Sequence, residues 1–200
     1  WPSNLVANTG CTFHFDIDAT EDMFDVFRRT ALTGEINPGY WSEKVRAGRD
    51  EVTGYSMDLL KKEIKATVRQ WIADDLDRRI RKLAKDIGLD ELTDSMRERA
   101  AEQVAPQARA FKRQLRKAVH DHFFGDMAEY NVEYKSEAHR ALHDFSFRPE
   151  GEDIPWPYQF EDWSEWPLSE FSHGFLWSCH AIRHGIDLYV ASRKAEQVAA

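Results

Sequence analysis

Residues 56–88, SMDLLKKEIKATVRQWIADDLDRRIRKLAKDIG, carry the clearest structural signal in the chain. Its apolar side chains recur mostly every three or four residues, which is the period of an α-helix. Ser56 is a favourable N-cap residue, and Gly88 is a favourable residue to follow the last turn. The pattern therefore predicts one helix of about 30 residues, roughly 45 Å long at 1.5 Å per residue.

Helical spacing continues after Gly88. It predicts a helix over about 91–104 and a separate one from Pro106 to near Gly125, because proline suits the first position of a helix. Two more helices are expected, over about 134–145 and 168–194. The near-heptad apolar stripes could pack within the chain or between two chains, so a homo-oligomer stays open as an alternative.

The N-terminal part has a different pattern. Residues 12–18, Thr-Phe-His-Phe-Asp-Ile-Asp, alternate polar and apolar side chains, which predicts a short strand. Asp18 is placed to cap a following helix that ends near Gly34. Residues 34–55 contain several turn-forming residues and are expected to form turns around a short helix near 43–47.

Residues 146–167 cannot be helical, because prolines interrupt them. We therefore expect a mainly α fold: a multi-helix bundle with a short N-terminal strand or hairpin and a long irregular Pro/Trp-rich loop before the last helix. An N-terminal segment, 1–55, is expected to pack on a bundle, 56–200, in one domain.

The composition limits the function. The 200 residues include 27 basic and 35 acidic side chains, and a net charge of −8 argues against a protein that coats DNA. Two cysteines, Cys11 and Cys179, favour reduced thiols in a cytoplasmic protein over a disulfide framework. No apolar run is long enough for a membrane span, and no signal peptide is expected. Trp1 leads us to expect that at least an initiator methionine precedes the sequence.

Histidines suggest one kind of site. His139 and His143 are four residues apart on one predicted helix, and His180 and His184 are four apart on another, with Asp187 nearby. Such spacing places two imidazoles on one helix face, where they can bind a metal. A divalent ion such as Zn²⁺ or Mn²⁺ is thus one interpretation. A polar face that contacts solvent or another helix is the other.

The pentapeptide Arg-Ala-Leu-His-Asp, residues 140–144, resembles the His-Asp pair of the HD phosphohydrolases. The resemblance implies an all-helical enzyme in which a metal is held by an upstream His, the pair and a downstream Asp. His120 or His122, then His143 with Asp144, then Asp187 would take those places. The metal would activate water for phosphate hydrolysis. The spacing before the pair is short, and proline-rich sequence follows where another helix is usual.

Charge is segregated along the chain. Residues 61–85 hold nine basic and four acidic side chains, whereas residues 150–170 hold seven acidic and no basic ones. One interpretation is that the basic helices contact nucleic acid phosphates. The other interpretations are solvated helix faces, or an acidic loop that packs over the basic helices. The candidates for phosphate contact are Arg69, Arg78, Arg81, Lys112, Arg113 and Arg116.

The acidic loop is also rich in aromatic residues, and the candidate partner-binding residues are Trp156, Tyr158, Trp163, Glu165 and Trp166. Exposed aromatics would anchor a protein partner, whereas buried ones would only fasten the loop. No P-loop, G-x-G-x-x-G, G-x-S-x-G or C-x-x-C motif is present. The leading expectation is a non-enzymatic accessory or inhibitor protein, of the kind that viruses of bacteria encode, which binds a protein partner without a cofactor.

Overall fold

A computed structural model describes residues 4–8, 12–16, 27, 36–89, 91–152 and 154–199. The fold is mainly α-helical, with short strands near the N-terminus and an irregular segment before the last helix. Contacts divide the chain into two compact units. Unit 1 combines residues 1–55 with 169–200, and unit 2 is residues 56–168. The last helix therefore belongs with the N-terminal strands, whereas the sequence pattern had placed it in the bundle.

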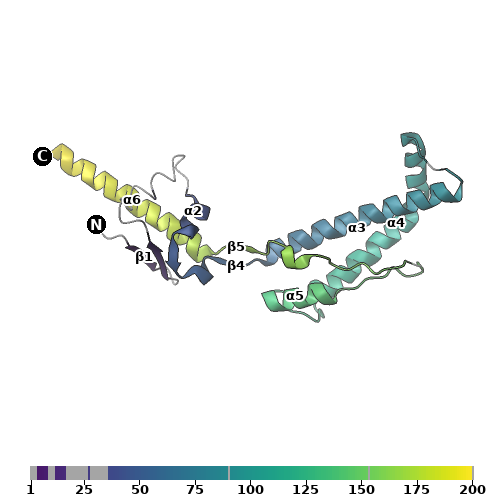
Figure 1. Ribbon diagram of the computed structural model, residues 1–200, viewed down its shortest axis with the longest axis horizontal. Coiled ribbons are helices and arrows are strands. Elements are labelled where there is room, and N and C mark those ends of the chain that lie inside the picture. The colour runs from purple at the N-terminus through teal and green to yellow at the C-terminus, as the bar shows by residue number, and fades with distance from the viewer. Residues whose placement is uncertain are drawn as a thin grey trace. The chain divides into compact units, whose positions relative to one another are not determined.

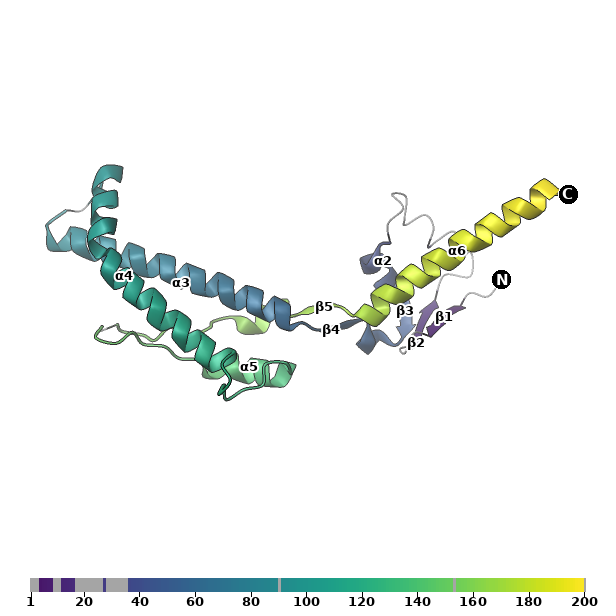
Figure 2. The same ribbon diagram turned by 180° about the vertical axis from the view of Figure 1, so that it is seen from behind.

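The strands of unit 1 form two small antiparallel sheets. The first has the order β1 (Asn4–Asn8), β2 (Thr12–Asp16) and β3 (Val45–Ala47) (Figure 2). Asn8 of β1 pairs with Thr12 of β2. The second pairs β4 (Thr53–Tyr55) with β5 (Ser169–Phe171). The predicted strand is thus present over 12–16. The predicted Asp18 cap and most of the helix after it lie outside the described residues.

The core of unit 1 is aromatic. Phe13 and Phe15 are fully buried on one side of β2, as their alternation with His14 predicts. The ring of Phe175 lies 5.5 Å from that of Phe13 and 6.5 Å from that of Phe15. Phe175 is on α6, so this aromatic packing explains why the last helix belongs to unit 1.

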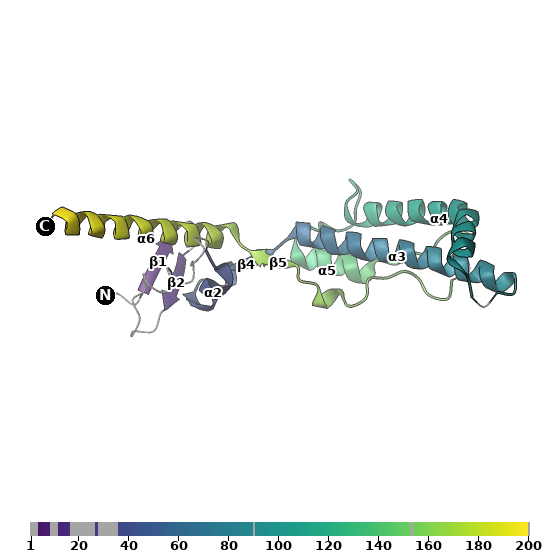
Figure 3. The same cartoon turned by 90° about the horizontal axis from the view of Figure 1, so that it is seen from above.

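Helix α6 (His173–Ala199) runs along one face of the first sheet (Figure 3). It begins later than predicted because residues 169–171 pair as β5, and the Ser172 hydroxyl then accepts a hydrogen bond from Phe175 N at 3.2 Å. Cys179 of α6 is a buried free thiol. No helix among the described residues is both long and apolar enough to cross a membrane.

A short helix, α2 (Pro38–Glu43), precedes β3, and the side chain of Asn37 caps it by accepting from Tyr40 N at 3.1 Å. The expected helix near 43–47 is thus shifted toward the N-terminus. Proline at the first helical position and the Asn37 cap favour a start at residue 38. Val45, which follows, is fully buried in the sheet instead.

Unit 2 is built on an antiparallel pair of helices (Figure 2). Helix α3 (Met57–Asp86) has 30 residues, and Ser56 Oγ caps it by accepting from Leu59 N at 3.3 Å. Gly88 follows it with a left-handed φ of 77°. The sequence of residues 56–88 therefore folds as predicted, with its cap and its stop in the expected places.

Helix α4 (Asp94–Phe123) is continuous across Pro106, where two separate helices were expected. Proline removes one backbone donor and crowds the preceding turn, but a helix that bends can continue past it. Figure 3 shows that α4 changes direction within its N-terminal part. The helix therefore bends instead of ending before Pro106, which is why one helix is found where two were expected.

A third helix, α5 (Lys135–Asp144), lies close to its predicted bounds. The chain after α5 runs back alongside α3 and includes one short 3₁₀ turn, η2 (Trp163–Glu165) (Figure 1). Its aromatic side chains complete the core of unit 2, where the ring of Trp71 from α3 lies 4.8 Å from that of Phe160. The long irregular loop is thus an integral part of unit 2.

Candidate functional site

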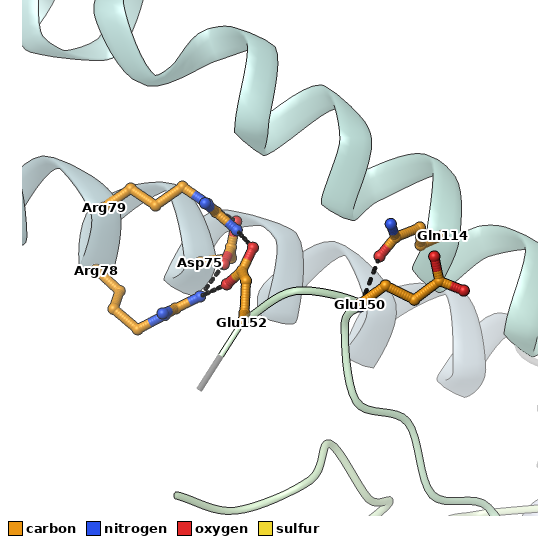
Figure 4. Close-up of polar contacts among 6 residues, drawn as sticks. All are labelled: Asp75, Arg78, Arg79, Gln114, Glu150 and Glu152. Carbon is orange, nitrogen blue, oxygen red and sulfur yellow. Dashed lines mark hydrogen bonds and ion pairs between the residues drawn. The ribbon is translucent and has the colours of Figure 1, made fainter. Parts of the chain in front are cut away.

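The irregular segment 146–167, here called the acidic segment, is fastened to α3 by charge. Glu152 and the buried Asp75 share the guanidinium groups of Arg78 and Arg79, and these four residues form the Asp75 cluster (Figure 4). Arg79 Nε donates to Asp75 Oδ2 at 2.7 Å, and Arg78 Nη2 donates to Glu152 Oε2 at 3.0 Å. A neighbouring bond at 3.2 Å joins Glu150 N to Gln114 Oε1 of α4.

Burial makes the Asp75 cluster a structural requirement. The Asp75 side chain has no exposed surface, and an unpaired carboxylate there would be very costly. Burial of Glu152 opposes its ionisation, but hydrogen bonds from Arg79 and Arg78 outweigh that effect and lower its pKa. The acidic segment therefore packs over a basic helix, which is one of the interpretations that the charge segregation left open. Arg78 is thereby engaged within the chain.

Aromatic contacts fasten the acidic segment further along. Tyr158 pairs with Phe147 through two backbone hydrogen bonds of 2.8 and 3.0 Å. The Tyr158 ring lies 5.2 Å from that of Phe111, and Phe160 is buried against Phe123 at 5.6 Å. Tyr158, a predicted partner-binding residue, is therefore half-buried in the packing of unit 2.

The tryptophans of the acidic segment differ in exposure. Trp163 is half-buried, with its ring 5.0 Å from that of His139, and Trp166 is half-buried with its ring 5.6 Å from that of Phe160. Glu165 between them is exposed. Trp156, in contrast, exposes 80% of its surface. Of the predicted partner-binding residues, Trp156 is the large apolar side chain that solvent reaches most freely.

The other candidate phosphate contacts are spread along the helix pair: Arg69, Arg81, Arg113 and Arg116 are exposed and Lys112 is half-buried. Arg69 of α3 and Arg116 of α4 line the same hollow between the two helices. Arg81 lines a different hollow with Lys85 and Arg97 at the other end of α3. The structure thus brings only part of the basic set together.

The hollow that holds Arg69 and Arg116, here called the groove, has a volume of about 330 Å³. Its floor is apolar, and its rim is basic. The floor consists of Ile64, Val68, Ile72, Val119 and Phe124, and the rim consists of Lys65, Arg69, Arg116 and His120. Sequence reasoning missed the groove because its floor residues follow the same helical spacing as core residues.

The histidine pairs lie in different units. His139 and His143 are on α5 in unit 2, and His180 and His184 are on α6 in unit 1. Within the described ranges, no three His, Cys, Asp or Glu side chains lie close enough to hold a metal ion. Asp187 pairs with Arg183 at 3.0 Å. No described residue set therefore favours the divalent-metal interpretation.

The His-Asp pair has partners of its own. His143 Nδ1 lies 2.7 Å from Asp144 Oδ1, and Tyr130 Oη donates to Asp144 Oδ2 at 2.6 Å. Both hydrogen bonds lower the pKa of Asp144, and the bond to Asp144 raises the pKa of Tyr130 to about 12. His122 Nε2 lies 2.9 Å from the carbonyl oxygen of Ala141, while His120 is exposed on α4.

His139 contacts an aromatic ring. Burial beside Trp163 lowers its pKa, and the charge of Lys135 adds to that effect. The two rings are tilted by 51°, and their contact packs α5 against η2. Among the described residues, His139 is not part of any group of three side chains that could hold a metal ion.

Comparisons of the chain with protein-family models, with curated proteins and with solved structures gave no match. Two surfaces of unit 2 stand out, the exposed Trp156 on the acidic segment and the groove between α3 and α4.

Proposed function

We propose that this chain is a non-enzymatic protein-binding module whose main anchor is Trp156. The observation that carries the proposal is the 80% exposure of Trp156 in a segment that is otherwise fastened to unit 2. Burial of an exposed indole by a partner stabilises the complex, and tryptophan is enriched among the residues that dominate binding free energy. The chain would act as an accessory or inhibitor protein.

The surroundings of Trp156 limit its freedom before binding. Pro155 and Pro157 flank it and restrict the backbone. Ile154 is buried on one side, and Tyr158 is bound to Phe147 on the other. Because a restricted backbone loses little conformational entropy on binding, more of the contact energy appears as affinity.

Charge indicates the kind of partner. Glu161, Asp162 and Glu165 are exposed on the acidic segment, and Glu150 is exposed before Trp156. Carboxylates on the same segment as an apolar anchor favour encounter with a basic surface. We therefore propose a partner that offers an apolar pocket within a basic surface, such as the nucleic-acid groove of another protein.

The test compares two exposed tryptophans. Immobilised wild-type protein, the Trp156→Ala variant and the Trp177→Ala variant are each exposed to a lysate of cells that produce the protein, and captured proteins are quantified by mass spectrometry. Trp177 is a matched control because it exposes 53% of its surface on α6 of unit 1. A protein that Trp156→Ala loses and Trp177→Ala retains is the expected result.

The identified partner is then purified and titrated calorimetrically. Loss of an interface anchor worth about 2 kcal/mol corresponds to a dissociation constant about 30-fold larger for Trp156→Ala. Its unfolding midpoint in urea should match that of the wild type, because Trp156 packs little in the free protein. Equal capture by all three forms would contradict the proposal.

Trp163 and Trp166 are poorer test residues. Alanine at either position removes a contact with His139 or Phe160, so a loss of binding could come from disturbed packing. Trp166→Ala is therefore useful only as a variant in which a change in stability is expected.

A further inference from the structure

The groove between α3 and α4 is a second surface, and its chemistry is opposite to that of the acidic segment. Ile64, Val68 and Val119 are buried at its floor, and Ile72 is half-buried there. Its volume of about 330 Å³ is at the lower end of the range of about 300 to 1,000 Å³ for ligand clefts. A few apolar side chains would fill it.

Three cations of the groove rim lack a counterion in the part of the chain that the structure describes. Among the described residues, no carboxylate forms an ion pair with Lys65, Arg69 or Arg116. Asp121 lies 3.6 Å from the fourth rim residue, His120, and is also bound to Lys117 at 2.5 Å. Lys65, Arg69 and Arg116 therefore present positive charge that no described carboxylate neutralises through an ion pair.

We infer that the groove binds an acidic amphipathic helix of a partner protein. Such a helix would place apolar side chains at i, i+3 or i+4, and i+7 on the floor, as in other helix-in-groove complexes. Its flanking Asp and Glu side chains would pair with Lys65, Arg69 and Arg116 at the edges. Arginine is well suited to this task because its guanidinium can hold a carboxylate through two hydrogen bonds.

The apolar floor favours a peptide over a nucleic acid. Phosphate contacts need cations on an accessible surface and gain nothing from Ile72 or Val68. Binding of apolar side chains, in contrast, is favoured in proportion to the apolar area that they cover. The combination of floor and rim is therefore the feature that identifies the occupant.

The experiment selects the ligand without bias. A displayed library of random 20-residue peptides is selected on the full-length protein and counter-selected on the double variant Arg69→Glu and Arg116→Glu. The expected peptides are rich in Asp and Glu and carry Leu, Ile or Phe at helical spacing. A synthetic copy should bind the wild type at least 30-fold more tightly than the double variant, and less tightly as salt rises.

The matched control is the double variant Arg81→Glu and Arg99→Glu. It changes the net charge of the protein equally, but its positions lie outside the groove and are exposed. It should bind the peptide within about threefold of the wild type. A floor variant, Ile72→Gln, should weaken peptide binding about tenfold. Circular dichroism checks that each variant is folded.

Three outcomes would overturn the inference. Selection could give no binder, or binders without acidic residues, or binders that both double variants lose equally. Nucleic acid would be the correct occupant if a fluorescent 20-base DNA binds the wild type, fails to bind Arg69→Glu and Arg116→Glu, and is unaffected by Ile72→Gln. The inference is independent of Trp156, because Trp156→Ala should bind the peptide normally.

Discussion

Two parts of α3 carry the same kind of charge and are used differently. In its C-terminal half, Arg78 and Arg79 are paired with Asp75 and Glu152 in the Asp75 cluster. In its N-terminal half, Arg69 lines the groove and has no described counterion. The difference is whether an acidic residue from elsewhere in the chain reaches the helix.

A basic helix is therefore not by itself a sign of an acidic partner. A guanidinium beside a buried carboxylate contributes to folding, and its loss leaves a charge without a partner. A guanidinium without one contributes little to folding and is available for binding. Measurements of the free energy of unfolding can therefore distinguish the arginines of the two halves of α3.

The largest effect is expected for Asp75→Ala. This variant leaves Arg78 and Arg79 without their buried acceptor and should lower the free energy of unfolding by about 3 kcal/mol. Urea denaturation followed by circular dichroism measures it. Asp74→Ala, at the exposed neighbouring position, should change stability by less than about 0.5 kcal/mol. Similar losses in both variants would contradict a special role of the Asp75 cluster.

Arg79→Ala should have the next largest effect, a loss of about 2 kcal/mol. Arg79 donates to both Asp75 and Glu152, and hydrogen bonds to charged groups are worth about 1.5 to 3 kcal/mol. Combining Arg79→Ala with Glu152→Ala should cost less than the sum of the two single changes. Strict additivity in the same denaturation experiment would show that the two side chains do not interact.

Glu152→Gln should reduce stability by about 1 kcal/mol at neutral pH, because the side chain is only 23% exposed and partly desolvated. The folded protein lowers the pKa of Glu152 below its unfolded value. Its stabilisation is therefore complete above the unfolded pKa, near 4.3, and is lost as pH falls through the lower folded pKa.

Denaturation of both forms between pH 7 and pH 3 tests this. The difference between wild type and Glu152→Gln should be constant down to about pH 5 and then shrink. A difference that grows as the pH falls would mean that the pKa is raised.

The smallest effect is expected for Arg69→Ala. No described acidic group pairs with Arg69, so its removal should change the free energy of unfolding by less than about 0.5 kcal/mol. The same denaturation assay compares it directly with Arg79→Ala. A loss as large as that of Arg79→Ala would remove the distinction between the two halves of α3.

The helices of unit 2 could largely be predicted from the sequence because their signals are local. Ser56 and Gly88 mark the ends of α3 through backbone chemistry that depends on few neighbours. Pro106 could not be interpreted locally, because the same residue can start a helix or bend one. Membership of α6 in unit 1 depends on the fit of Phe175 between the rings of β2, which no local pattern records.

The candidate sites were predictable only as residue types. Aromatic side chains of the acidic segment were recognisable, but the exposure of Trp156 and the burial of Phe160 depend on where the segment lies on α3. The charge pattern suggested pairing of acidic and basic regions without indicating that Glu152 meets Arg79. The groove exists because parts of two helices leave a space between them, which is a property of their packing.

One topological feature affects how the protein is made. Residues 56–168 interrupt unit 1, and β4 and β5 bring the two ends of that interruption together. During synthesis, the β2 strand with Phe13 and Phe15 leaves the ribosome before α6 has been translated, with a delay of roughly ten seconds at ordinary elongation rates. In that interval the nascent chain exposes an aggregation-prone aromatic surface. We therefore expect the folding of unit 1 to depend more on chaperones than the folding of unit 2.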